Sequence, residues 1–176
     1  MRNLMFSSVL LLLMAPFNGL TTTAVIPASI QQLLPQSMLV GSGRLSYLFW
    51  DIYDAYLYAP HGNYQPSKPC ALRLSYLRDL NGADIADRTI EEMRLQGIKD
   101  ELLLADWHSQ MKAIIPNVQA GTELIGFYTD EGYTLFYHDN RNIGEIKNTA
   151  FSQSFFRIWL GQQTSEPQLR QALLGQ

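Results

Sequence analysis

Two arginines in this sequence, Arg44 and Arg73, stand where a cation could lie beside a small bound molecule. Each interrupts an alternating, aromatic-rich run that is typical of a β-strand. A guanidinium that faces a pocket can hold a carboxylate through paired hydrogen bonds or stabilise a developing negative charge. The alternation places Arg44 on the strand face opposite Leu45, and Arg73 on the same face as Ser75. For both arginines a second interpretation stays open, in which the side chain points to water.

The other residues with reactive side chains are not spaced for catalysis or for metal binding. Cys70 is the one cysteine, so no disulfide can form within the chain, and its place at the start of a strand-like run indicates a core residue. Glu91 and Glu92 are adjacent on a predicted helix and point apart, so they are poor acid–base partners. No two histidines have metal-ligand spacing; they are His61, His108 and His138. The sequence therefore predicts neither a metal site nor a cofactor.

The composition is that of a single folded domain. The chain has 176 residues, of which 47% are hydrophobic and 16% are charged, which is enough apolar material for a sizeable core. The formal net charge is -3 and there is no basic run, so we do not expect a nucleic-acid partner. Nine Tyr, eight Phe and three Trp suit strands and the wall of a pocket.

Residues 1–24 have the features of a secretory signal peptide. A positive charge at Arg2 precedes an apolar run, and a motif of small residues ends at Ala24. The apolar run is shorter than the ~20 residues that span a bilayer. We therefore expect cleavage after Ala24 and a periplasmic product. An uncleaved interfacial anchor is the alternative, and it is the one membrane contact that the sequence suggests.

The remaining pattern indicates an α+β domain. Residues 25–37 show no clear period and are interpreted as a lead-in to a domain at 38–176. The expected strands lie in 38–60 with a bend near Trp50-Asp51, and at 70–77, 121–139 (a hairpin) and 142–147. The expected helices lie at 83–96, 100–114, 148–161 and 165–175, with Ser165 as the N-cap of the last. Strands joined by hairpins and partly segregated helices favour an antiparallel sheet that helices cover on one face.

Three segments resemble the chalcone isomerase-like superfamily, and most closely its bacterial exported branch. They read "FYHDNRNIGEIKNTAFSQSFFRIWLGQQTSEPQLRQALLG", "WDIYDAYLYAP" and "LRLSYLRDLNGADIADRTIEEM". The likeness runs over about residues 38–175. It implies an open-faced β-sandwich, in which a large antiparallel sheet carries a layer of helices with a pocket between them.

The same resemblance implies that isomerase chemistry is absent. Plant enzymes of the superfamily surround the substrate with an arginine, a threonine, a helical tyrosine and asparagine, and a Ser or Thr on the last helix. Arg44 matches the arginine, and the other positions fall on Tyr53, Ile85, Glu92 and Leu169. An isoleucine cannot donate to an oxyanion, and the loss of one such donor typically costs ~10²–10³ in rate. A glutamate at the asparagine position would repel a phenolate.

Fatty-acid-binding members of the superfamily seat a carboxylate on an arginine and a tyrosine. By that likeness we expect a non-catalytic carrier for an amphipathic anion such as a fatty acid. The expected ligand-binding residues are Arg44, Tyr53, Arg73, Ile85 and Glu92. The alternatives are an isomerase or lyase-type enzyme that uses Arg44 and Tyr53, and a structural envelope protein that binds no ligand.

The leader generates the first testable prediction. The mature protein is expected to begin at Val25 and to be soluble in the periplasm, because the apolar run suits a signal peptidase substrate. N-terminal sequencing of the protein from the cell envelope measures this directly. A membrane-bound product that still begins at Met1 would contradict the prediction.

Overall fold

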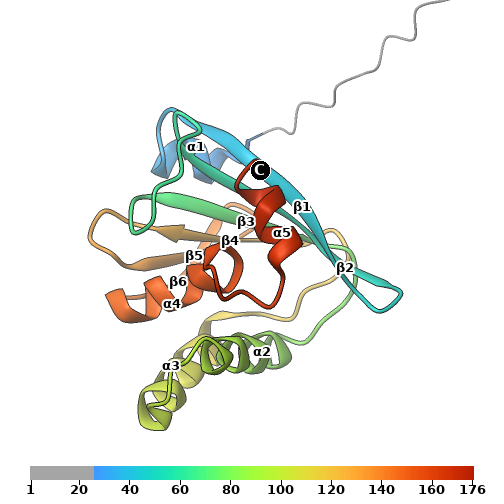
Figure 1. The fold of residues 1–176 in the computed structure, drawn as a ribbon, viewed down its shortest axis with the longest axis vertical. Helices are drawn as coiled ribbons and strands as arrows, with labels where there is room; N and C mark the ends of the chain where they lie inside the picture. The colour runs from blue at the N-terminus through green and yellow to red at the C-terminus, as the bar shows by residue number, and fades with distance from the viewer. Residues whose placement is uncertain (1–25) are drawn as a thin grey trace, which may run out of the picture.

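One antiparallel sheet of six strands organises the protein. The computed structural model describes residues 26–176 (Figure 1), so the predicted leader lies outside the described residues. The strands follow one another across the sheet in sequence order. They are β1 (Ser37–Tyr47), β2 (Trp50–Pro60), β3 (Cys70–Tyr76), β4 (Glu123–Tyr128), β5 (Thr134–His138) and β6 (Arg141–Ile146). Every connection between neighbours is therefore either a hairpin or a longer antiparallel return.

Helices cover the two faces of the sheet unequally (Figure 1). The helices are α1 (Ala28–Leu33), α2 (Gly82–Leu95), α3 (Glu101–Ile114), α4 (Thr149–Leu160) and α5 (Pro167–Leu173). Residues of α2 to α5 form the main core with one face of the sheet. On the opposite face, Ile30 of α1 and the nearby Leu34 pack in a smaller cluster with strand residues such as Tyr58. Within residues 26–176, no helix has the length and apolar character needed to cross a bilayer.

The predicted α+β class and the antiparallel sheet with its helical layer are confirmed. Three local predictions were wrong. The turn between the first two strands lies at Leu48-Phe49, just before the expected bend. Residues 28–33, expected to form no element, make helix α1, which is too short to show a helical period. Ser165 does not cap α5, because its hydroxyl donates to Glu92 instead and the N-cap is Glu166.

The helical layer is held by large side chains in the main core. Trp107 of α3 is fully buried, and its ring meets the edge of the Phe151 ring of α4 at 5.5 Å between centroids. Asn148 caps α4 by accepting a hydrogen bond from the Phe151 N–H at 2.9 Å. Asp100 caps α3 in the same way through the Leu103 N–H at 3.0 Å. These contacts fix α3 and α4 over the sheet, and so define one wall of the space beneath them.

The last helix approaches β1 closely at a glycine. A Cβ on Gly41 would lie 2.2 Å from the backbone oxygen of Ala172 and 2.7 Å from that of Leu173. Backbone atoms cannot rotate away as a flexible side chain can. The absence of a side chain at Gly41 is therefore what allows α5 to rest on the first strand.

Gly41→Ala is expected to lower the free energy of unfolding by about 1–3 kcal/mol, because α5 must shift to admit the methyl group. Ser42→Ala, at the exposed neighbouring position, is the matched control and should change stability by less than about 0.5 kcal/mol. Urea denaturation of both variants measures the difference. Equal stability of the two would show that α5 does not depend on this contact.

Candidate ligand-binding cavity

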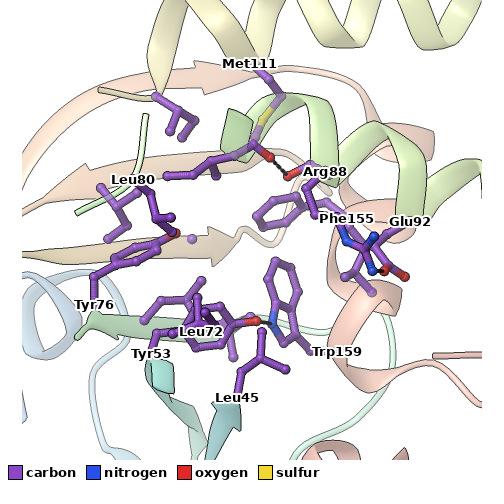
Figure 2. A pocket seen from close by; sticks show the side chains of 18 of the residues that line it. Leu45, Tyr53, Leu72, Tyr76, Leu80, Arg88, Glu92, Met111, Phe155 and Trp159 are labelled. Carbon is purple, nitrogen blue, oxygen red and sulfur yellow. Dashed lines mark hydrogen bonds and ion pairs between the residues drawn. The ribbon is translucent and has the colours of Figure 1, made fainter. Parts of the chain in front are cut away.

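An apolar cavity of about 280 Å³ lies between the sheet and helices α2 and α4. Figure 2 shows side chains that enter it from both layers. The lining side chains from the sheet include Leu45, Ile52, Tyr53, Leu72, Leu74, Tyr76, Leu124 and Phe136, and those from the helices include Ile85, Thr89, Met111, Phe155, Ile158 and Trp159. The volume is near the lower end of those of small-molecule sites, which are usually apolar with few polar groups.

A hydrogen bond joins the sheet to helix α4 in the wall of this cavity (Figure 2). The indole N–H of Trp159 donates to the hydroxyl oxygen of Tyr53 at 2.9 Å. Burial raises the pKa of Tyr53, and the Trp159 donor opposes this only in part. The phenol therefore keeps its proton at neutral pH. Because Tyr53 accepts from Trp159, its own O–H remains a donor that a ligand oxygen can use.

Tyr76 supplies a second hydroxyl to the same space. Tyr53 and Tyr76 are directly paired across β2 and β3, so they share a face of the sheet, and their rings meet edge to face at 5.7 Å. Burial raises the pKa of Tyr76, and the neighbouring Tyr53 adds to the effect. Its side chain lines the cavity, so the hydroxyl can donate a hydrogen bond to a ligand or a water molecule there.

The charged part of the lining lies on another side of the cavity from Tyr76 (Figure 2). Glu92 is buried, and its carboxylate accepts hydrogen bonds from the Arg88 guanidinium and, at 2.9 Å, from the Ser165 hydroxyl. Arg88 is exposed and also donates to Glu91 at 3.0 Å. The positive charge of Arg88 is therefore shared between two carboxylates before any ligand arrives.

The expectation that Arg44 lies at the polar end of the cavity was wrong. Its neighbour Leu45 lines the cavity, so the alternation of β1 turns Arg44 to the opposite face. There the exposed guanidinium donates to Asp54 at 2.6 Å and to Asp51 at 2.8 Å. Arg44 is thus the centre of a surface ion-pair cluster on the first hairpin, and the contribution of such clusters to stability is small.

Arg73 lies outside the cavity for the same reason. Leu72 and Leu74 line it, and Arg73 between them points to the face that α1 covers. Its guanidinium forms an ion pair with Glu123 at 2.6 Å and lies over the ring of Tyr56 at 4.6 Å. The cavity expectation for Arg73 was therefore wrong as well.

The structure does bring the other expected residues together. Tyr53, Ile85 and Glu92 all line the cavity, Tyr53 from β2 and the other two from α2. Leu169 is buried in the core near β1 and is not among the lining residues. Cys70 is also buried, which raises the pKa of its thiol to about 12, so it is not a nucleophile at neutral pH.

Several lining residues were missed by the sequence reasoning. The i to i+4 spacing of Arg88 and Glu92 on a helix could have indicated their ion pair. Tyr76 and Trp159 were not among the expected ligand-binding residues. Their roles follow from the register of β2 against β3 and from the packing of α4, which no local pattern encodes.

The interior of the cavity is apolar and carries a few hydrogen-bond donors. The interior supplies two phenol donors that stay protonated, and the residues around them are apolar. The lining also includes the carboxylates of Asp84, Glu92 and Glu166, of which Glu92 is hydrogen-bonded to Arg88 and Ser165. Within residues 26–176, no group of three His, Cys, Asp or Glu residues could hold a metal ion.

The comparisons with known proteins agree with this fold. The family model for chalcone isomerase-like proteins matches residues 21–175. A crystal structure of a fatty-acid binding protein from Arabidopsis thaliana superposes with a TM-score of 0.62 at 16% sequence identity, covering 80% of this chain and 87% of that chain. No curated protein sequence matches at a significant level. Because the family model spans the sheet and all the helices over it, this chain belongs to the chalcone isomerase-like family.

Proposed function

We propose that this protein is a non-catalytic binding protein for an amphipathic small molecule. The observation that carries the proposal is the apolar cavity with the Tyr53 and Tyr76 hydroxyls as donors inside it. An apolar chain would fill the space between α2 and the sheet, and a polar atom of the ligand would accept from one of the phenols. The fold is shared with a protein whose title names fatty-acid binding, which makes a lipid-like ligand the first class to test.

Apolar burial supplies most of the affinity in this proposal. A chain of about ten methylenes would contribute roughly 8 kcal/mol at ~0.8 kcal/mol each, before the costs of association. One neutral hydrogen bond to a phenol adds only about 0.5–1.5 kcal/mol. The hydroxyls therefore set the orientation of the ligand more than its affinity.

The charges around the cavity favour a neutral head group over an ionised one. Arg88 is the only cation among the described lining residues, and it is already paired with Glu91 and Glu92. Asp84 and Glu166 add further negative charge to the lining. An ionised fatty acid would have to compete with Glu92 for the guanidinium, whereas an alcohol, an ester or a protonated acid would not.

The absence of isomerase activity also belongs to this proposal. Ile85 stands at the position of a helical phenol and cannot donate a hydrogen bond. Glu92 accepts hydrogen bonds from Arg88 and Ser165, and its carboxylate would repel a phenolate. The alternative of an isomerase or lyase-type reaction is weakened further because Arg44 cannot reach the cavity to act with Tyr53.

The setting that we propose is the periplasm of a bacterium. This rests on the signal-peptide features of residues 1–24 and on the likeness to the exported branch of the family. In that compartment a carrier would shield an apolar ligand from water between membranes.

Filling the cavity with a larger side chain should weaken ligand binding. Ile85→Trp places a large ring in the space and is expected to weaken the binding of decanol by at least about tenfold. Ala83→Trp, on the exposed side of the same helix, is the matched control and should bind like the wild type. Isothermal titration calorimetry measures all three proteins. If the wild type binds neither decanol nor decanoate, the result would favour a structural protein that binds no ligand.

The same titrations compare the head groups. Decanol is expected to bind at least as tightly as decanoate at pH 7.5, because the Arg88 charge is already satisfied by carboxylates. A preference for the acid of more than about tenfold would show that Arg88 exchanges its partners for the ligand.

Chalcone isomerase activity is expected to be absent. With a 2′-hydroxychalcone, the loss of absorbance in the presence of purified protein should equal the spontaneous cyclisation, because the donor at the position of Ile85 is missing. A rate clearly above the spontaneous one, lost in Tyr53→Phe, would favour the enzymatic alternative.

A further inference from the structure

The end of the first hairpin is an exposed cluster of large apolar side chains, here named the apolar tip (residues 47–50). The exposed fractions are 67% for Tyr47, 76% for Leu48, 98% for Phe49 and 61% for Trp50. Four consecutive residues of this kind are unusual on the surface of a water-soluble domain. Such a surface generally marks a site of contact with a protein or a membrane.

The tip projects from the body of the protein (Figure 1). β1 and β2 have eleven residues each and run past the other elements, so the turn between them stands clear of the helices. Tyr47 and Trp50 are paired across the ladder, and the two residues between them form the turn. Tyr47 and Trp50 therefore share one face of the hairpin, and Leu48 and Phe49 lie beyond them in the turn.

The turn is built at a conformational cost. Leu48 has a φ of +55°, in a region that favours Gly or Asn and is costly for a bulky side chain. An Asn or a Gly would make this turn more easily, so the leucine does not serve the local fold. Strain combined with full exposure indicates a role outside the folded chain.

Polar and charged side chains lie directly behind the apolar tip and are here named the polar collar (Arg44, Ser46, Asp51, Asp54 and Arg78). The guanidinium of Arg78 lies over the Trp50 ring at 4.9 Å, and Ser46 donates to Asp51 at 2.6 Å. Arg44 joins Asp51 and Asp54 in the ion-pair cluster of the same hairpin. Two cations and two anions lie together here, so the collar carries no net charge.

We infer that the apolar tip inserts into the interfacial region of a zwitterionic lipid bilayer. Aromatic rings next to a ring of polar groups match the polarity gradient at a membrane surface, where Trp and Tyr are enriched. A tip of four residues is small for a specific protein interface, which takes about 20–30 residues a side, whereas a fluid lipid layer can close around it. The neutral collar removes any need for anionic lipids. This contact is additional to the one expected from an uncleaved leader.

The tip is also connected to the cavity. Leu45 and Ile52, which line the cavity, lie on the same two strands only two residues from Tyr47 and Trp50. Insertion of the tip would therefore bring the cavity close to the lipid from which an apolar ligand could enter. This second step rests on the proposed function, whereas membrane binding by the tip does not.

Vesicle flotation of the ligand-free mature chain with phosphatidylcholine vesicles tests the tip by itself. The double variant Leu48→Asn/Phe49→Ser is expected to lower the partition constant by at least about tenfold. Asn suits the positive φ at position 48, so the variant should keep or raise the thermal stability. The matched control, Leu95→Ser/Leu102→Asn, removes two other exposed leucines, from α2 and α3, and should bind like the wild type.

Two further readouts identify the mode of contact. Trp50 is exposed while Trp107 and Trp159 are buried, so quenching by brominated lipid should be lost in Trp50→Phe. Binding should persist in 0.5 M NaCl, because the collar carries no net charge. Binding that requires anionic lipid and disappears in salt would overturn the inference. So would a failure to bind vesicles, including one accompanied by tip-dependent dimers in sedimentation.

Transfer of a fluorescent alcohol from vesicles to protein separates this inference from the proposed function. If Ile85→Trp abolishes transfer while flotation is unchanged, the tip and the cavity act as described. Vesicle binding without any transfer by the wild type would leave the membrane contact standing and would count against the binding function.

Discussion

The hydrogen bond from Trp159 to Tyr53 joins the helical layer to the sheet inside an otherwise apolar space. An indole N–H or a phenol buried without a partner costs free energy, so each needs the other where it stands. Tyr76 packs against the Tyr53 ring, and Phe155 against the Trp159 ring at 5.2 Å. The bond is therefore held in a layer of aromatic contacts that leaves its partners little freedom. A cavity with such a wall is formed before a ligand arrives, which lowers the ordering cost of binding.

The second link between the layers is electrostatic. Glu92 of α2 is buried, and it is stabilised only because Arg88 and Ser165 both donate to it. Ser165 precedes α5, so this carboxylate ties α2 to the segment that leads into the last helix. Moving either donor away would leave the buried carboxylate of Glu92 uncompensated, which is costly. The three side chains are therefore held in place together. The same arrangement keeps Arg88 from acting as a ready-made site for an anion, and in this respect this cavity differs from one built around an unpaired arginine.

The sequence was sufficient for most of the fold but not for the orientation of its charges. Alternation and helical periodicity predicted the strands and the four larger helices, because each pattern is set by local geometry. The family resemblance gave the positions of Tyr53, Ile85 and Glu92, all of which line the cavity. It also gave Arg44, but a position on a strand does not state which face the helices cover. The partners Tyr53 and Trp159 lie 106 residues apart, so their contact depends on tertiary packing that no short pattern carries.

The first hairpin combines two features that folding alone does not explain. Leu48 adopts a backbone conformation that a smaller residue would adopt at lower cost, and its side chain contributes to no core because it is exposed. Of the non-glycine residues with positive φ among the described residues, which are Gln36, Leu48, His61, Ser67, Asp139 and Asn140, Leu48 is the one apolar side chain. A position that breaks a local rule without a gain in packing is a candidate for function. The same hairpin carries Leu45 and Ile52 into the cavity. A long two-stranded ribbon can thus hold an apolar end in one environment and a binding surface in another, with the neutral polar collar of Arg44, Arg78, Asp51 and Asp54 between them.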